Sequence, residues 1–189
     1  MSFDAVHDTQ KAFRLLTDCS AFPGKTADLS ELAGKISLDL PFSRGTALLS
    51  LTLMDGEVSF FTENEGAAKR LSELTYSRKS PLDRAQYILT GTNDPAPYMD
   101  GADKGDLIDP HRGATIIMMV DSLAEGEEYE LKGPGIETVK NVKIGSCHDW
   151  LTPLARANKE FPLGVELYLL DGDDRLMVLP RTTRIRRVK

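Results

Sequence analysis

The chain has 189 residues, and its 23 basic and 29 acidic side chains give it a formal net charge of −6. A composition of 41% hydrophobic and 28% charged residues is typical of a folded globular domain and excludes disorder and collagen-like repeats. The acidic balance excludes a global electrostatic footprint for nucleic acid or for an anionic membrane. We therefore expect a single domain over residues 1–189 that binds no nucleic acid.

The cysteines and the N-terminus predict a cytoplasmic protein. The two cysteines, Cys19 and Cys147, lie in stretches predicted to be helical, and neither belongs to a CxxC pair. The first ten residues are polar and acidic and lack the apolar segment of a signal peptide. The longest apolar runs, such as residues 114–120, fall far short of the roughly 20 residues that span a bilayer. We expect reduced thiols and no contact with a membrane.

The first half of the chain predicts three helices and two strands. Apolar residues recur every three or four positions over residues 6–20, which predicts an amphipathic helix capped by Asp8 or Thr9. The sequence Phe22-Pro23-Gly24 ends it. Residues 45–54 are apolar on nearly every side, so they predict a buried helix, part of whose cover could come from a second copy of the chain. A strand (57–62), a polar helix (65–76) and a buried strand (85–90) follow.

The second half begins with a loop over residues 91–112 that is rich in Gly, Asp and Pro and has a short helix near 98–103. Residues 114–120 predict a strand covered on both faces, and residues 128–132 a half-exposed strand that ends at Gly133-Pro134-Gly135. A helix over 146–159 contains Trp150, and three strands follow at 165–170, 175–179 and 183–189. The order of elements predicts an α/β fold, a single mixed-sheet domain with helices on both faces.

No motif for catalysis, metal binding or cofactor binding stands out. Gly24-Lys25-Thr26 matches the end of a P-loop, but Cys19 stands where the first glycine belongs and the preceding segment is helical, so we interpret it as an ordinary loop. The three histidines lie far apart and lack ligand spacing; His111, in the long loop, is the one to follow as a candidate base. There is no G-x-S-x-G elbow and no dinucleotide fingerprint. We expect no catalytic group, no metal and no cofactor.

Two charged segments have both a structural and a functional interpretation. The acidic residues 125–128 fall where a hairpin turn is expected, so we expect them to face water rather than to act as paired carboxylates. The tail carries Arg184, Arg186 and Arg187, which protect an edge strand or form a docking surface for an acidic partner or a phosphate-bearing ligand.

A third segment, Arg181-Thr182-Thr183, lies between two predicted strands and offers a guanidinium and two hydroxyls to an anion. The alternative is that these side chains satisfy buried carbonyls at a strand bend. We favour the alternative, because most side-chain hydrogen bonds are made to backbone or water.

Several motifs, taken together and in order, resemble the PhnH family, a subunit of the bacterial carbon–phosphorus lyase system for phosphonate breakdown. These motifs are Ala12-Phe13-Arg14-Leu15-Leu16 running to Phe22-Pro23-Gly24, Gly113-Ala114-Thr115, Leu131-Lys132-Gly133-Pro134-Gly135-Ile136, Phe161-Pro162-Leu163-Gly164-Val165-Glu166 and Leu179-Pro180-Arg181-Thr182-Thr183. The resemblance covers nearly the whole chain. It departs from the family's pattern at Glu166, where Asp is usual, and at His111, where an acidic residue is common, so a role for carboxylates at these two places is in doubt.

The resemblance implies a homodimer that joins sister subunits in the lyase core assembly, which displaces adenine from ATP with a phosphonate. It also implies a fold like the large domain of pyridoxal-phosphate-dependent transferases, with a vestigial cofactor site. The candidate ligand or interface residues are Arg14, Thr115, Gly133, Gly135, Arg181, Thr182 and Thr183.

Three functions are then to be distinguished. We favour a non-catalytic subunit of a phosphonate-processing complex, which makes a ribose phosphonate triphosphate from ATP and an alkylphosphonate. The alternative is an independent enzyme or binding protein for a phosphorylated or phosphonate small molecule, using Arg181, Thr182 and His111. A nucleic-acid binder that uses the basic tail conflicts with the net charge of −6.

Overall fold

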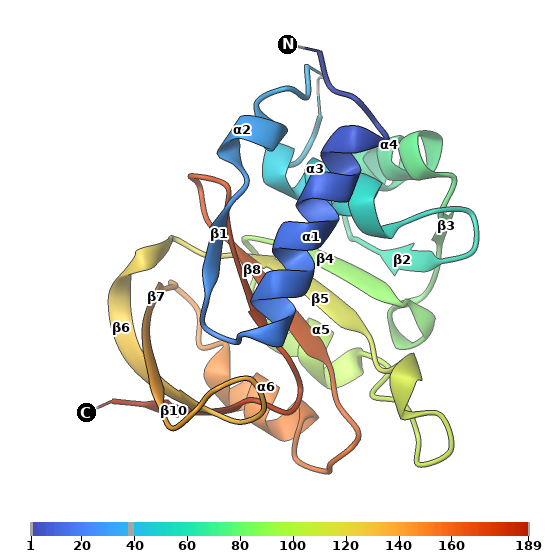
Figure 1. Cartoon of the computed structure of the whole chain (residues 1–189). Coiled ribbons are helices and arrows are strands. Elements are labelled where there is room, and N and C mark those ends of the chain that lie inside the picture. The colour runs from blue at the N-terminus through green and yellow to red at the C-terminus, as the bar shows by residue number, and fades with distance from the viewer. Residues whose placement is uncertain (1, 38–39, 189) are drawn as a thin grey trace.

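The computed structural model describes residues 2–37 and 40–188, which form an α/β fold with two sheets (Figure 1). The helices are α1 (His7–Ala21), α2 (Ser30–Ala33), α3 (Arg44–Leu53), α4 (Glu65–Thr75), α5 (Ala96–Gly101) and α6 (Leu151–Ala157), with short 3-10 turns at Leu82–Arg84 and Pro110–Arg112. The strands are β1 (Thr26–Asp28), β2 (Ser59–Phe61), β3 (Arg78–Lys79), β4 (Tyr87–Gly91), β5 (Thr115–Met119), β6 (Ser122–Lys132), β7 (Lys140–Gly145), β8 (Glu166–Leu170), β9 (Arg175–Leu179) and β10 (Arg184–Arg187). No helix in the described ranges is long and apolar enough to cross a membrane.

The larger sheet has seven strands in the order β1-β9-β8-β5-β4-β2-β3. Strands β8, β5, β4, β2 and β3 are parallel, and at one side β9 pairs antiparallel with both β8 and β1. The predicted strand at 114–120 is confirmed as β5 between β4 and β8, and Ile116, Ile117 and Met118 are buried there. A central parallel strand is covered on both faces, which explains its continuous apolar run.

Helices cover both faces of the larger sheet, as predicted. Helices α1, α2, α3 and α4 contribute to a core on one face (Figure 1). Helices α5 and α6 and the smaller sheet contribute to the core on the other face. Ala47, Leu48 and Leu49 of α3 are at most 1% exposed within this one chain, so the chain itself supplies the cover of these three residues.

The smaller sheet, in the order β10-β6-β7, was not predicted. It is antiparallel throughout and lies at the lower left of Figure 1, to the left of α6. The single-sheet prediction therefore needs correction, and so does the hairpin tip at residues 125–128. These residues belong to β6, where the pairing with β7 shifts between Ser122 and Glu127. Gly126, at φ +124°, permits this bulge: a Cβ there would lie 2.4 Å from backbone atoms of Gly145.

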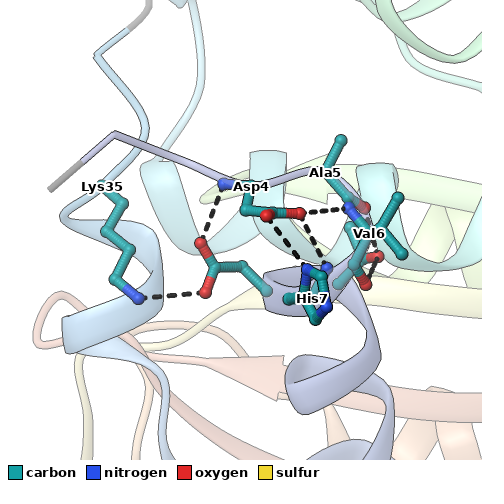
Figure 2. A network of polar contacts seen from close by, with 7 residues as sticks. Asp4, Ala5, Val6, His7 and Lys35 are labelled. Carbon is teal, nitrogen blue, oxygen red and sulfur yellow. Dashed lines mark hydrogen bonds and ion pairs between the residues drawn. The ribbon is translucent and has the colours of Figure 1, made fainter.

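A polar network, not the predicted cap, begins α1 (Figure 2). Asp4 accepts hydrogen bonds from the backbone N–H groups of Val6 and His7, both at 2.9 Å. Asp8, predicted as a cap, is instead 3% exposed and accepts a hydrogen bond from Lys35 at 2.9 Å. Thr9 donates its hydroxyl to the carbonyl of Ala5. The contact between Asp8 and Lys35 therefore holds the start of α1 against the segment that follows α2.

Other boundaries follow the prediction with one large exception. The helices predicted at 6–20, 45–54 and 65–76 are confirmed as α1, α3 and α4, and short α5 lies near its predicted place. The helix predicted over 146–159 begins only at Leu151, so Cys147 lies in an exposed loop rather than in a helix. Pro153 lies in the first turn of α6, where its missing N–H costs no helical hydrogen bond. Cys19 is buried in α1, and burial raises the pKa of its thiol to about 11.

Candidate functional site

The cleft that we call the cationic cleft lies between α6, the end of β6 and the segment joining β9 to β10. Its volume is about 700 Å³. The lining residues are Lys132, Gly133, Pro134, Leu151, Leu154, Ala155, Asn158, Lys159, Phe161, Arg181, Thr182, Thr183, Arg184 and Ile185. It therefore brings together four of the seven residues proposed from the sequence: Gly133, Arg181, Thr182 and Thr183.

Arg181 is held by the protein's own oxygens. Its backbone N–H and its Nε donate to the Glu166 carboxylate at 2.9 and 2.5 Å, and its Nη1 donates to the carbonyl of Pro110. The side chains of this ion pair are only 14% and 24% exposed. The interpretation that Arg181 satisfies a carbonyl at a strand bend is confirmed, and Glu166 does supply a carboxylate despite its extra methylene.

Arg181 fastens two loops to the start of the parallel sheet. A Cβ on Gly113 would lie 2.7 Å from Arg181 Nη1 and 2.1 Å from the carbonyl oxygen of Gly164, so a side chain there would push the loops apart. Thr115, another candidate, opens β5 and is paired in register with Glu166 on β8. Thr115 therefore supports the strand that holds Arg181 rather than lining the cleft.

Thr183 leaves a hydroxyl without a partner in the wall of the cleft. The residue is 8% exposed, and its Oγ1 makes no hydrogen bond within the described part of the chain. Its backbone N–H donates to the carbonyl of Pro180 at 2.8 Å, which fixes the turn before β10. A buried hydroxyl left unpaired costs about 1–3 kcal/mol, which a ligand atom or a rotation of the side chain would recover.

Gly133 permits the close approach of two segments at this wall. Its φ is +146°, and a Cβ would lie 2.8 Å from the carbonyl oxygen of Thr182. The turn after β6 therefore packs directly on the β9–β10 segment. The predicted tight turn at Gly133-Pro134-Gly135 is confirmed, and its first glycine shapes the cleft.

The lining of the cationic cleft combines positively charged and apolar side chains. Lys132 pairs with Glu130 at 3.2 Å, whereas Lys159 and Arg184 make no ion pair with any described residue. Leu151, Leu154 and Ile185 form apolar walls. Phe161 is 77% exposed and lies among the same lining residues. Such a combination suits an anionic group carried on an apolar body.

The remaining candidates lie elsewhere. Gly135 packs against the end of α1, where a Cβ would lie 2.1 Å from the carbonyl oxygen of Ala21. Arg14 lines a different cavity, with Lys11, Asp18, Asp28 and Glu31 around it. The structure therefore does not bring Arg14 or Gly135 to the cationic cleft.

The other sequence motifs form no site in the described residues. His111 is exposed, its Nδ1 lies 4.0 Å from Asp109 Oδ1, and it is not one of the residues that line the cleft. Lys25 of the P-loop-like sequence pairs with Asp18, and Thr26 opens strand β1 rather than a helix. Residues 2–37 and 40–188 contain no group of three or more potential metal ligands.

The basic tail forms the edge strand β10. Arg186 pairs with Glu130 at 3.0 Å and Arg187 with Glu127 at 2.8 Å, so these two guanidiniums neutralise the acidic face of β6. Arg187 also lies over the ring of Tyr129, 5.9 Å from its centroid. Two of the three tail arginines are thus used within the fold, and only Arg184 turns its charge to the cleft.

Sequence reasoning missed Lys159 and Asn158. Asn158 bonds both the N–H and the C=O of Val165, at 2.7 and 3.1 Å, and so closes the loop after α6. A Cβ on Gly164 would lie 2.3 Å from Asn158 Oδ1, which ties the Phe-Pro-Leu-Gly motif to this contact. The signal for Lys159 was only a single charge at a helix end, which no motif distinguishes.

The fold and the cleft together define an α/β protein with a cationic, partly apolar binding surface where its two sheets meet. A family model described as "Bacterial phosphonate metabolism protein (PhnH)" matches residues 2–186. The chain belongs to the PhnH family.

Two relatives of the chain carry related names. The chain is 29% identical over 180 residues to "Putative C-P lyase subunit protein HtxG" of Stutzerimonas stutzeri, covering 93% of this chain and 85% of that protein. It is 27% identical over 190 residues to "Alpha-D-ribose 1-methylphosphonate 5-triphosphate synthase subunit PhnH" of Rhizobium meliloti (strain 1021), covering 97% of this chain and 93% of that protein. The prediction of the family from its motifs is confirmed.

Proposed function

We propose that this chain is a non-catalytic subunit of a multi-subunit phosphonate-processing assembly, one that makes a ribose phosphonate triphosphate as a step in carbon–phosphorus bond cleavage. The observation that carries the proposal is the family match over residues 2–186. Both named relatives are described as subunits, and the chain covers 85% and 93% of their lengths. Because the similarity extends over most of both relatives, we infer that this chain has the same role as a subunit.

A second function rests on the cationic cleft. The uncommitted charges of Lys159 and Arg184, beside the orphaned hydroxyl of Thr183, favour binding of a phosphate- or phosphonate-bearing small molecule. Arg181 contributes only indirectly to this function, because Glu166 and Pro110 already occupy it. Within an assembly, the same cleft would hold an anionic substrate group or an acidic segment of a sister subunit.

The proposed relation to pyridoxal-phosphate-dependent transferases, with a vestigial cofactor site, draws support from the five parallel strands and the helices on both faces. The crevice at the carboxyl ends of β2 and β4 is lined by hydroxyls, amides, apolar groups and the carboxylate of Glu63. No lysine is found among its described lining residues, so these residues offer no amine to hold the cofactor covalently. The residues present do not fit that cofactor.

The homodimer and the cytoplasmic location remain proposals. Apolar side chains that a second copy would cover are exposed at Leu107 and Ile108, 72% and 89%, and at Phe13, 51%. Analytical ultracentrifugation of the purified chain tests the dimer. A single species at the mass of one chain, across concentrations to the hundred-micromolar range, would contradict it.

The subunit proposal is tested by omission. The sister subunits are purified with and without this chain and supplied with ATP and methylphosphonate, and formation of the ribose phosphonate product is followed by ³¹P NMR. We expect product only when this chain is present and none from this chain alone. Product formed by the chain alone, or at an unchanged rate without it, would contradict the proposal.

A further inference from the structure

A second cavity, which we call the switch-point crevice, lies at the opposite end of the larger sheet from the cationic cleft. Its volume is about 360 Å³. The lining residues are Pro41, Phe42, Ser43, Thr46, Thr62, Glu63, Asn64, Ala67, Leu89, Thr90, Gly91, Thr92, Asn93 and Met119. They follow the carboxyl ends of the parallel strands β2, β4 and β5 or open helices α3 and α4.

The strand order makes this place a topological switch point. Strand β2 lies between β3 and β4 in the sheet. The chain leaves β2 through α4 to reach β3 at the sheet edge, whereas it leaves β4 in the opposite direction, towards β5. Helix α4 packs with the core on one face of the sheet and α5 with the core on the other. The segments leaving β2 and β4 therefore diverge, and open α/β sheets bind ligands in the crevice that such divergence creates.

Buried hydroxyls in this crevice lack good partners. Thr62 is 6% exposed, and its hydroxyl makes no hydrogen bond to a described residue. Thr90 is 3% exposed and donates only to the carbonyl of the next residue, Gly91, at 3.3 Å. Gly91 adopts φ +58°, and no atom lies within 4 Å of the position of a Cβ there, so the space beside these hydroxyls is open. Thr62 Oγ1 is not among the fully buried unpartnered atoms of the described residues, so it opens onto the crevice and is available to a ligand.

The two amide side chains present one donor and one acceptor. Asn64 Oδ1 accepts from the N–H of Ala67 at 3.0 Å, which leaves its Nδ2 group without a partner among described residues. Asn93 Nδ2 donates to the hydroxyl of Tyr98 at 3.0 Å and to Glu63 Oε2 at 3.4 Å, and its Oδ1 accepts no hydrogen bond from a described residue. Both asparagines are exposed and line the crevice, so one offers a donor and the other an acceptor to a nitrogen heterocycle, and Phe42, Leu89 and Met119 supply apolar walls.

The charges in the crevice disfavour an anion. Among the described lining residues, Glu63 alone is ionisable. Two first-turn amides of α3 already have acceptors, because Gly45 N–H donates to Asp174 Oδ1 at 2.9 Å and Thr46 N–H to Ser43 Oγ at 3.1 Å. A phosphate there would meet a carboxylate and no cation.

We propose that the switch-point crevice binds an uncharged nucleoside, with its flat base between the apolar walls and its sugar hydroxyls against Thr62 and Thr90. This inference rests on the crevice alone and stands or falls separately from the subunit role. It assigns the two ends of the sheet to different ligands, an anionic group at one and a neutral ring at the other.

The test is titration calorimetry of the full chain with adenosine, guanosine, cytidine and uridine, each beside its 5′-monophosphate. We expect at least one nucleoside to bind more tightly than its monophosphate. Thr62→Val, which removes only the hydroxyl, should weaken that binding about fivefold. Thr17→Val, on the exposed side of α1, is the matched control and should leave it unchanged.

Ala67→Leu supplies a second variant, because it fills the crevice from α4 and should abolish binding while the thermal midpoint shows that the chain still folds. No binding by any of the four nucleosides at millimolar concentration would overturn the proposal. So would a monophosphate that binds as tightly as its nucleoside, or an affinity unchanged in both variants.

Discussion

The cationic cleft and the switch-point crevice lie at opposite ends of one sheet and differ in what surrounds them. The cleft is built by the smaller sheet and α6 and carries Lys132, Lys159 and Arg184. The crevice is built by the ends of parallel strands, and Glu63 is the one ionisable group among the lining residues that the structure describes. The parallel strands position the polar and apolar residues of the crevice, whereas the smaller sheet and α6 supply most of the positive charges of the cleft. In this chain the cationic cavity is therefore built largely by elements outside the parallel strands.

The largest expected effect is a loss of stability in the part of the fold that builds the cationic cleft. Trp150, 1% exposed, packs on Tyr129 with ring centroids 5.0 Å apart and joins α6 to the smaller sheet. Trp150→Ala should lower the free energy of unfolding by about 3–5 kcal/mol, because a large core side chain is lost. Urea denaturation followed by circular dichroism measures this loss.

Leu48→Ala is the matched change on the other face, in α3. It should cost about 2–5 kcal/mol. If the comparison holds, Trp150→Ala should weaken anion binding far more than Leu48→Ala at ligand concentrations where both variants are folded. Equal losses of anion binding would show that the smaller sheet does not define the cleft.

The second effect concerns the fastening of Arg181. Glu166→Gln leaves a partly buried guanidinium without its counter-ion and should lower the free energy of unfolding by about 2 kcal/mol. Glu166→Asp keeps the charge and should cost less. A thermal midpoint for Glu166→Gln equal to that of the unchanged chain would contradict the role of Arg181 as a fastening residue.

The third effect concerns anion binding and the positive charges of Lys159 and Arg184 in the cationic cleft. Lys159→Gln combined with Arg184→Gln should weaken binding of phenylphosphonate, an anion with an apolar ring, by about tenfold at low salt. The unchanged chain should lose affinity as salt rises, and the double variant should lose less. Lys69→Gln combined with Arg70→Gln, on α4, supplies a control with the same change of net charge.

The smallest effect concerns pH and the start of α1. Hydrogen bonds from the backbone and side chain of His7 lower the pKa of Asp4 from 3.8 to about 2. Because the folded-state pKa is depressed, the stabilisation is present above pH 4 and is lost as pH falls towards 2. Asp4→Asn should flatten the pH dependence of the thermal midpoint in that window. An identical pH profile for both chains would contradict this assignment.

The sequence predicted the parallel core better than the site. Periodicity identified α1, α3, α4, β5, β8 and β9, because each buries an apolar face that local sequence displays. It missed β1, β7 and the smaller sheet, since short or charged strands such as Lys140–Gly145 owe their structure to pairing rather than to an apolar pattern.

The site shows the same division. The Arg181-Thr182-Thr183 segment was identified because its residue types are chemically distinctive. Its partners Glu166 and Pro110 lie 15 and 71 positions away, so only the fold reveals that Arg181 is already occupied. The crevice went unnoticed because its threonines and asparagines are ordinary loop residues until the strand order brings them together.

The most direct measurement of the central claim is the dependence of the assembly on this chain. Sister subunits are mixed with increasing amounts of the purified chain, ATP and methylphosphonate, and the initial rate of product formation is followed. The account predicts a rate that rises from zero and saturates at a fixed ratio of chains, with no product from this chain alone. A rate that continues to rise in proportion to this chain after its partners are saturated would show that it performs the reaction itself.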